Sequence, residues 1–445
     1  MSNPQAGRYG WYVAAVLALA HLVSMIDRFA MGVLLVPIKS AMHLSDTELA
    51  VLHGLGFVIL YCLIGIPLGR VADRFDRRRL IAIGILFWSI AAAGCGLASS
   101  FSELFIARLA VGLGEACLVP AAMSLIAAYF AADRLGRATA LFTAGAAMGH
   151  AAAFLAGGTL LAFLTARGGL NVPVFGNLAP WQGTFLLMSL PGFVIAALAL
   201  SIREPPRAPK DSRGADSLRA GLAHVRAHAR AYAMHTGTFA TLMAIIHVVA
   251  AWTVSFYARK HGVSVRDAAV LVGITQLTAA PLGHVLGGWV FDRLRRRGTT
   301  GAPGMAMATS LVLVAISATV FLKAQSAQLA DVGYVALLFC IGLGCAPGYA
   351  GLQLLTLDSH RGVVMGTFVC VYTLIALGLA PLSVGLLSDF VFEDSLGDAV
   401  LTGILTLASV GIIVGLAGRR SYQRSASGVT GLPVQLEPAT ARSAS

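Results

Sequence analysis

Long runs of apolar residues, separated by short polar gaps, fill the chain from Trp11 to Gly418. A membrane-spanning helix needs roughly 20 mostly apolar residues, because each residue adds about 1.5 Å along the helix axis. Twelve runs meet this requirement. The pattern therefore predicts twelve membrane spans, near residues 11–36, 47–69, 80–99, 103–130, 138–165, 183–202, 236–258, 266–290, 304–323, 331–355, 363–388 and 398–418.

Composition agrees with this pattern. Of 445 residues, 57% are hydrophobic and only 12% are charged, and the mean hydropathy is +0.80, whereas soluble proteins carry about 25% charged residues. The net charge of +12 does not indicate nucleic acid, because Lys and Arg are confined to the gaps. All six cysteines fall inside apolar runs, so we expect them to be packing residues.

The basic residues predict the topology. Gaps after even-numbered spans are rich in arginine, at 70–79, 134–137, 293–297 and 361, whereas the other gaps are charge-poor or mixed. The gap at 259–266, with Arg259, Lys260 and Arg266, is the one exception. By the positive-inside rule, the chain is predicted to be a multi-pass protein of the cell inner membrane with both termini in the cytoplasm.

The longest gap, at 203–235, divides the spans into two groups of six. It opens with Arg203-Glu204-Pro205-Pro206, which ends a helix. Apolar residues then recur at helical spacing opposite arginines, which predicts a basic amphipathic helix on the inner leaflet, either a tether or a regulatory segment. The predicted organisation is a cytoplasmic N-terminus (1–10), a six-helix bundle (11–202), this linker (203–235), a second six-helix bundle (236–418) and a disordered tail (419–445).

One string occurs at matching positions of the two groups. Gly-x-x-x-Asp-Arg followed by a basic cluster begins at Gly69 after span two and at Gly288 after span eight. Such a repeat indicates two related bundles. Glycine allows close helix approach, and an Asp at a helix end accepts charge-assisted hydrogen bonds. We therefore predict a conformational latch between the bundles; the alternative is that these charges are only solvated. The latch residues are Gly69, Asp73, Arg74, Arg78, Asp292 and Arg293.

Both strings resemble the signature loops of the major facilitator superfamily. The resemblance covers residues 11–418 and implies an all-α integral membrane protein, with twelve transmembrane helices in two six-helix bundles. The family usually has Gly where this chain has Asp76 and Arg295, so the loop geometry here is expected to be less tight.

Charged residues inside the predicted spans are candidates for function, because burying them in a membrane is costly. Asp27 and Arg28 lie deep in span one, and Arg108 and Glu115 share one face of span four. If the two spans face one cavity, the four side chains form a roughly neutral network. A carboxylate that loses its arginine partner in one state can take up a proton there. The alternatives are a permanent structural charge set and, for Arg28, binding of an anionic substrate group.

A narrower resemblance joins these residues. The run Met25-Ile26-Asp27-Arg28-Phe29, Arg108-x-x-x-Gly112-x-Gly114-Glu115, and the segment from Ala380 to Asp389 are similar to Spinster-type transporters. This resemblance implies that Asp27 and Glu115 act in proton coupling, with Arg28 beside them. Eukaryotic members of that family move lysophospholipids and sphingosine phosphate, and bacterial members are more varied, so the substrate stays open.

Four further polar residues within spans are candidates for lining the substrate cavity together with Arg28 and Arg108: His150, His247, Tyr349 and Tyr372. A lone histidine in a membrane is more often hydrogen-bonded to a backbone carbonyl, which is the expectation for His284.

These observations predict a secondary active transporter that works by alternating access. It moves a small anionic organic or amphipathic solute and is coupled to protons; the alternative is uptake of a small carboxylic acid by proton symport. No nucleophile, metal or ATP-binding motif occurs, so we expect neither an enzyme nor a pump; a channel or a sensor remains open. The expected partners are substrate, protons and the lipid bilayer, with no cofactor, metal or nucleic acid, and the chain is expected to be a monomer.

Overall fold

The structure is a computed structural model that describes residues 8–72, 75–130, 132–205, 223–297, 301–356, 361–393 and 395–430. Twelve helical segments in these ranges are long and apolar enough to cross a membrane, which confirms the predicted spans. Their ends differ from the predicted ends by several residues, because helices continue beyond the apolar runs into polar residues.

The first half of the molecule (8–205) contains the first six spans and one β-hairpin. Its elements are α1 (Arg8–Met42), then α2 (Asp46–Ala50), the π-helix η1 (Val51–Leu55) and α3 (Gly56–Ala72) as span two, α4 (Arg77–Cys95), α5 (Phe101–Glu115) and α6 (Leu118–Tyr129) as span four, α7 (Ala132–Ala166), β1 (Leu170–Val172), β2 (Gly176–Leu178) and α8 (Pro180–Leu200). The strands pair antiparallel, with Leu170 opposite Leu178.

The second half (223–430) repeats the plan. Its elements are α10 (Ala229–His261), α11 (Val265–Arg296), α12 (Ala302–Lys323), α13 (Ala327–Leu355), then α14 (Arg361–Thr373), the π-helix η3 (Leu374–Leu379) and α15 (Ala380–Phe390) as span eleven, and α16 (Leu396–Thr430). Spans two and eleven are thus each interrupted by a π-helical turn, a feature that is frequent at functional sites.

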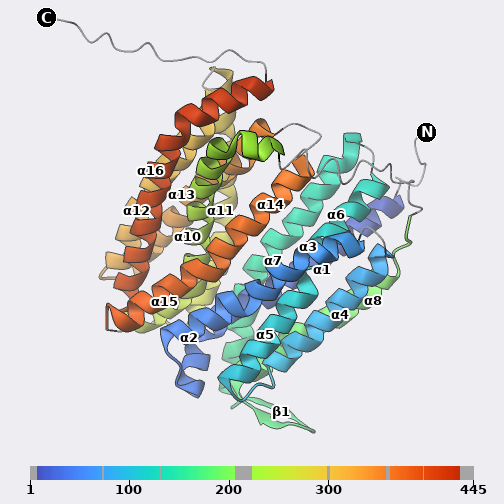
Figure 1. Cartoon of the computed structure of the whole chain (residues 1–445). Coiled ribbons are helices and arrows are strands. Elements are labelled where there is room, and N and C mark those ends of the chain that lie inside the picture. Colours follow the sequence, from blue (N-terminus) through green and yellow to red (C-terminus); the bar gives the residue numbers. More distant parts are fainter. Residues whose placement is uncertain are drawn as a thin grey trace, which may run out of the picture.

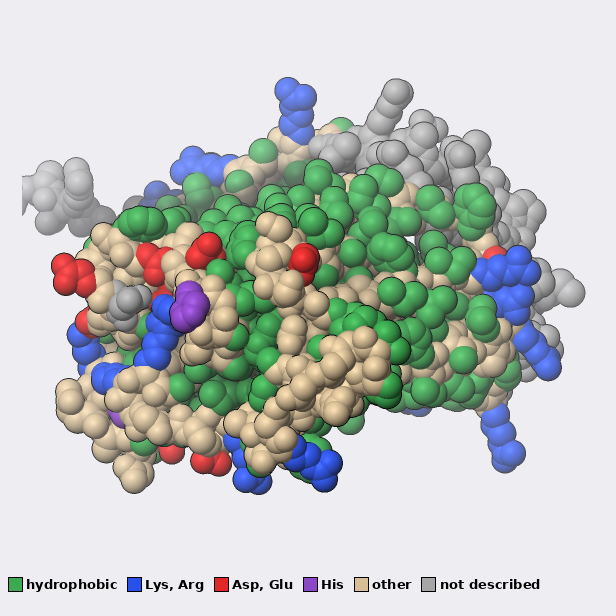
Figure 2. Space-filling view, turned by 90° about the horizontal axis from the view of Figure 1, so that it is seen from below, with side chains coloured by type: hydrophobic (Ala, Val, Ile, Leu, Met, Phe, Trp, Pro, Cys, Tyr) green, Lys and Arg blue, Asp and Glu red, His purple; other side chains and the backbone are tan. Residues whose placement is uncertain are grey.

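Two bundles lie side by side (Figure 1), with the helices of the first half on one side and those of the second half on the other. The β-hairpin and α2 lie at one end, which we call the hairpin end. The first residues of α1 and the last residues of α16 lie at the opposite end, the termini end. Hydrophobic side chains form a broad area in the middle and on the right of the face seen from below, whereas charged side chains gather on its left part and at its margins (Figure 2). Such a surface is suited to lipid.

Two predicted boundaries differ from the structure. The helix α10 begins at Ala229, so the last part of the predicted linker belongs to span seven; residues 206–222, including the first residues of the predicted amphipathic helix, lie outside the described residues. The helix α16 continues to Thr430, so the beginning of the predicted disordered tail is helical. Tyr422 explains this extension, because its side chain is buried and its hydroxyl donates to the carbonyl oxygen of Gly351 at 2.8 Å.

The two halves touch closely towards the hairpin end. A Cβ atom at Gly32 of α1 would lie 2.8 Å from the carbonyl oxygen of Ala250 in α10, and one at Gly54 of η1 would clash with the carbonyl oxygen of Leu377 in η3. A Cβ atom at Gly158 of α7 would lie 2.6 Å from Cβ of Ala269 in α11. These glycines are required for contact between backbones of opposite halves.

The same helices leave side chains uncovered towards the termini end. Leu155 of α7 packs against Gly273 of α11. Towards the termini end, Met148 lies two turns before Leu155 on α7, and Leu277 lies one turn after Gly273 on α11. Met148 is nevertheless 55% exposed and Leu277 is 48% exposed. A Cβ atom at Gly65, further along span two from Gly54, would meet no atom within 4 Å. The halves are therefore closed together at the hairpin end and parted at the termini end.

Candidate functional site

An ion pair joins spans one and four within the first half. Nη2 of Arg28 lies 2.6 Å from Oε2 of Glu115, and the hydroxyl of Ser24 donates to the same oxygen at 2.7 Å. Arg28 and Ser24 lie one turn apart on α1, so both side chains reach Glu115. Glu115 is the last residue of α5, where span four is interrupted before α6 begins at Leu118. The structure thus joins two of the four predicted charges in a direct ion pair, and the other two, Asp27 and Arg108, lie beside it.

Two aromatic rings border the guanidinium of Arg28. Its Cζ atom lies 4.4 Å from the ring centroid of Phe57 and 5.0 Å from that of Tyr61, both on α3. Such cation–π contacts stabilise a charge that has left water. The side chain of Arg28 is 13% exposed, whereas Glu115 is fully buried. Arg28 is therefore the member of the pair that an incoming solute can reach.

Asp27 and Arg108 do not form the ion pair that a fully connected network would require. Nη1 of Arg108 donates to the backbone carbonyl oxygen of Asp27 at 3.3 Å, and its Cζ atom lies 5.7 Å from the ring centroid of Phe57. Among the described residues, Oδ2 of Asp27 has no hydrogen-bond partner, although the side chain is buried. A buried carboxylate oxygen without a partner is costly when charged, and Asp27 lacks the ion pair that Glu115 has, so Asp27 is the less compensated acid of this site.

The predicted histidines occupy two different environments. The ring of His150 stacks on Phe29 at a centroid distance of 3.7 Å, and within the described ranges its Nε2 has no partner. The ring of His247, from the second half, lies 6.2 Å from Phe29, and its Nδ1 is 3.0 Å from the carbonyl oxygen of Met243. His284 has the predicted carbonyl partner, Ala280, at 2.7 Å.

The sequence analysis missed three buried histidines, His21, His53 and His235, of which His53 lies in the π-helical turn of span two. His53 lies in η1 and is almost completely buried, and neither ring nitrogen has a partner among the described residues. A titratable residue inside the apolar run 47–69 was the available signal. The π-helical turn that directs its side chain depends on packing against the second half, which the sequence does not reveal.

The two predicted tyrosines form a pair in the second half. The hydroxyl oxygens of Tyr349 and Tyr372 lie 3.2 Å apart, and both rings contact Phe239, with centroid distances of 4.8 and 5.4 Å. Tyr372 also interacts electrostatically with Arg28 and Tyr61 of the first half. Because Tyr349 is 37% exposed, this pair offers a polar group on the side of the second half that faces the Arg28 site.

The predicted latch is only partly described. Asp73 and Arg74 lie outside the described residues, and Gly69 lies in α3. Arg78 donates to Asp76 at 3.2 Å and to the carbonyl oxygen of Ile202 at 3.3 Å, both within the first half.

Asp292 and Arg293, on α11, are exposed, and the Cζ atom of Arg293 lies 5.6 Å from the ring centroid of Trp289 on the same helix. The hydrogen bonds of the described latch residues therefore do not join the halves in this state, which agrees with their separation at the termini end.

The neighbouring Arg77 has a structural role that the sequence analysis missed. Its Nε donates to Glu204 at 2.7 Å and its Nη1 donates to the hydroxyl of Ser124 at 3.0 Å, and the side chain is buried. Arg77 thus ties the start of span three to span four and to the residues that follow span six. The carboxylate in Arg203-Glu204-Pro205-Pro206 was the available signal.

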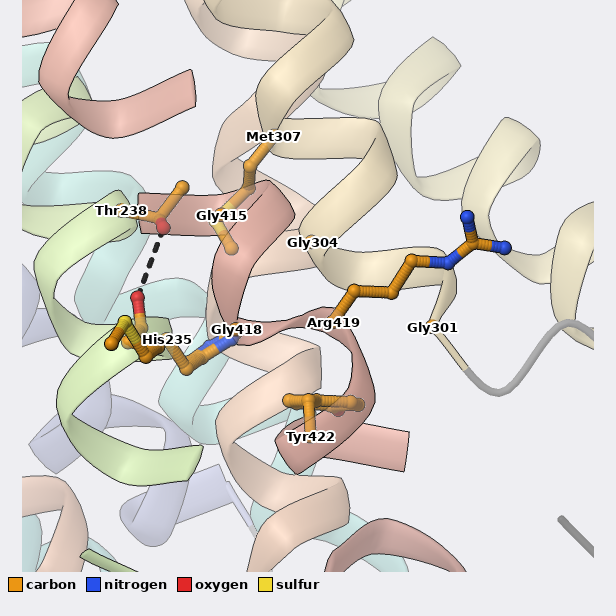
Figure 3. Close-up of a pocket in the computed structure, with 10 residues that line it drawn as sticks. His235, Thr238, Gly301, Gly304, Met307, Gly415, Gly418, Arg419 and Tyr422 are labelled. Atoms are coloured by element: carbon orange, nitrogen blue, oxygen red, sulfur yellow. Dashed lines mark hydrogen bonds between the residues drawn. The ribbon is translucent and has the colours of Figure 1, made fainter. Parts of the chain in front are cut away.

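A small cavity lies near the termini end of the second half (Figure 3). It is lined by residues of α10, α12 and α16, including His235, Thr238, Gly304 and Tyr422, and Arg419 points away from it. Its volume of about 10 Å³ holds at most one water molecule. Nε2 of His235 is already 2.7 Å from the carbonyl oxygen of Gly348. This cavity is too small for an organic solute.

Comparison with known proteins agrees with the fold. An efflux pump of the MFS type from Mycolicibacterium smegmatis is 28% identical over 444 residues, which cover 95% of this chain and 98% of the pump. Protein spinster of Drosophila melanogaster is 24% identical over 309 residues, covering 67% of this chain and 48% of that protein.

A solved structure extends the comparison. It is that of a bacterial homologue of the human lysosomal transporter Spinster, in an inward-facing, unoccupied conformation. It superposes with a TM-score of 0.79, at 23% identity, over 97% of this chain and 100% of the other. This likeness confirms the predicted architecture of two six-helix bundles.

The family model of the Major Facilitator Superfamily matches residues 17–381. Together with the Spinster relatives, it confirms both predicted resemblances. The members of this family are membrane transporters and not enzymes, as the sequence predicted. The chain therefore belongs to the Major Facilitator Superfamily.

Proposed function

We propose that this protein is a proton-coupled secondary transporter that moves a small anionic or amphipathic solute by alternating access. The observation that carries the proposal is the buried pair of Arg28 and Glu115, next to a buried Asp27 whose Oδ2 has no hydrogen-bond partner among the described residues. Buried charges in a membrane protein mark the path of a substrate or an ion.

The proton step uses the two acids. An anionic group that binds Arg28 competes with Glu115 for the guanidinium, so Glu115 loses its counter-ion as the solute arrives. A buried carboxylate without a counter-ion is far less stable than the neutral acid, so Glu115 then takes up a proton. Asp27, one residue before Arg28, is the second acceptor. Binding of the solute and binding of a proton therefore favour each other.

The uncovered apolar side chains favour an amphipathic solute over a small carboxylic acid. The two halves meet along two lines, one between α7 and α11 and one between spans two and eleven. Met148 and Leu277 are exposed beside the first line, and Leu63 and Leu374 are exposed on the spans that form the second. An alkyl chain inserted there covers apolar area, at roughly 25 cal/mol per Å². A carboxylic acid without a tail gains nothing from these surfaces.

The predicted topology gives this state its direction. If the protein lies in the inner membrane, the positive-inside rule predicts that the termini end faces the cytoplasm. The site is then open to the cytoplasm and closed to the outside. Closure at the termini end would bring the described latch residues of the two halves, among them Arg78 and Asp292, towards each other. We expect a monomer, because one chain supplies both bundles.

Vesicle transport tests the proposal. The full chain is reconstituted in vesicles with an internal pH dye, and lysophospholipids, sphingoid phosphates and small carboxylic acids are screened under an imposed proton gradient. We expect one amphipathic anion to move with protons in the wild type. Asp27→Asn should lose proton movement by at least tenfold, because the amide cannot bind and release a proton.

The matched control is Asp398→Asn. It removes a carboxylate of the same kind from an exposed ion pair with Lys323, at 2.8 Å, far from the site. Its transport should equal that of the wild type. Proton coupling that persists in Asp27→Asn and in Glu115→Gln would falsify the proton step. Movement of a small acid alone would favour the alternative substrate class, and equilibration without uphill accumulation would indicate a channel.

A further inference from the structure

A group of polar residues from both halves meets at the hairpin end. We call it the hairpin-end cluster; its members are Lys39, Asp46, Arg259, Ser388 and Asp389. Asp46, the first residue of α2, has a carboxylate that is completely buried. Arg259 of α10 holds it with two bonds, from Nη1 to Oδ2 at 2.6 Å and from Nη2 to Oδ1 at 2.5 Å. This bidentate geometry gives strong, directional recognition of a carboxylate.

Two more donors reach the same carboxylate. Nζ of Lys39, on α1, lies 2.7 Å from Oδ1, and the hydroxyl of Ser388, on α15, donates to Oδ2 at 2.8 Å. Asp46 thus binds one donor of its own half and two side chains of the second half. It is the centre of the cluster.

A second carboxylate makes the reciprocal contact. The backbone N–H groups of Asp46 and Thr47 donate to the two oxygens of Asp389, at 3.0 and 2.7 Å. Asp389 lies on α15 in the second half, so the start of span two is held by an acid of the opposite bundle. The close approach also requires Gly385, where a Cβ atom would lie 2.7 Å from the carbonyl oxygen of Asp46.

These contacts are reversible in a way that apolar contacts are not. When the halves part, Asp46 and Arg259 regain water, which offsets most of the lost attraction. Water is close, because a cavity of about 370 Å³, lined by Lys39, His43, Ser45, Asp389 and Glu393 among others, opens beside the cluster. Removing one partner has a different effect. Without Arg259, the buried Asp46 carboxylate keeps only Lys39 as a counter-ion while the halves stay closed; without Asp46, the two cations lose the anion that they share. The closed state is then selectively destabilised.

We propose that the hairpin-end cluster is the gate of the transporter at this end, and that Asp46 sets the balance between the two states. The proposal rests on the alternating access proposed above, but not on proton coupling. Four hydrogen bonds join Asp46 to the second half. Its carboxylate accepts two from Arg259 and one from Ser388, and its backbone N–H donates one to Asp389. These bonds close the gate around Asp46.

The distance between the two halves at the hairpin end measures the gate directly. Spin labels are placed at Val174, between β1 and β2, and at Gln328, at the start of α13, in the full chain with its six native cysteines replaced. Both positions are exposed and lie in opposite halves. Pulsed electron resonance in lipid nanodiscs then gives the populations of short and long distances, without substrate or proton gradient.

Asp46→Asn and Arg259→Gln should each raise the ratio of long to short distances by at least tenfold. Asp398→Asn is the matched control, because it breaks an ion pair that lies within the second half, and it should leave the ratio unchanged. Asp389→Asn weakens the backbone contact without removing the Asp46 charge, so it tests the gate even if Asp46→Asn does not fold.

Two results would overturn the gate. One is a folded Asp46→Asn or Asp389→Asn protein with the distance distribution of the wild type. The other is an equal shift in Asp398→Asn. Loss of proton coupling is not part of this readout, so the gate can stand while the proton step fails, and the reverse.

Discussion

The two halves share one plan but carry charge very differently. Among the described residues, every buried Asp, Glu and Arg side chain lies in the first half: Asp27, Asp46, Arg77, Arg108 and Glu115. The buried polar residues of the second half are hydroxyl side chains and His235. A common fold therefore needs no buried charge. Arg77 has a structural role in the first half, and the other four buried charges belong to the Arg28 site or to the hairpin-end cluster.

The first four residues of spans two and eight, 45–48 and 264–267, show the same difference in charge between the halves. Ser45 accepts the N–H of Glu48 at 3.2 Å, and Ser264 accepts the N–H of Asp267 at 3.1 Å. Both serines cap their helices, which both halves require. The next residue is Asp46 in span two but Val265 in span eight. The cap is repeated and the gate acid is not, so the cap builds the fold while the acid serves the gate.

The largest expected effect comes from breaking the charge of the first half. Glu115→Gln keeps the shape of the side chain but leaves Arg28 buried without its counter-ion, which costs about 3–5 kcal/mol. We expect transport to fall by at least two orders of magnitude and thermal stability to drop clearly. Rates in vesicles and unfolding followed by fluorescence measure the two effects.

The corresponding change in the second half should be mild. Tyr372→Phe removes one hydroxyl of the pair with Tyr349, and a neutral hydrogen bond contributes about 1 kcal/mol. Transport should change by less than about tenfold. If this variant is as damaging as Glu115→Gln, the functional asymmetry between the halves is wrong.

Close approach at the hairpin end gives the next effect. Gly54→Ala places a Cβ atom against the carbonyl oxygen of Leu377, so closure of the halves is hindered. We expect the long-distance population between labels at Val174 and Gln328 to rise about tenfold. Gly65→Ala in the same span is the control, because a Cβ atom there meets no atom within 4 Å. Equal behaviour of the two variants would contradict the closed and open ends described above.

The sequence predicted the spans and the two bundles because lipid demands long apolar helices, whatever they pack against. It also predicted that Arg28 and Glu115 belong to one site, because both are charges inside spans. It did not predict that Arg108 binds the backbone of Asp27 rather than its carboxylate. That choice depends on distances of a few ångströms, which a helical pattern does not fix.

The gate was visible in the sequence only as an anomaly. Arg259 lies in the one gap that does not follow the positive-inside pattern, and Asp46, just before the predicted start of span two, was not singled out. The two residues are 213 positions apart and lie in opposite halves. Their pairing follows from how the bundles meet, and hydrophobic periodicity within one span contains no information on that contact. The π-helical turn that carries His53 was missed for the same reason.

The smallest effect tests whether the caps of spans two and eight are equivalent. Ser45→Ala and Ser264→Ala each remove one helix cap, which contributes about 1 kcal/mol. We expect both variants to lower thermal stability by a similar, small amount and to leave the distances between the halves as in the wild type. If Ser45→Ala alone shifts those distances, then the cap of span two is part of the gate, and the division between a repeated structural element and a single functional acid does not hold.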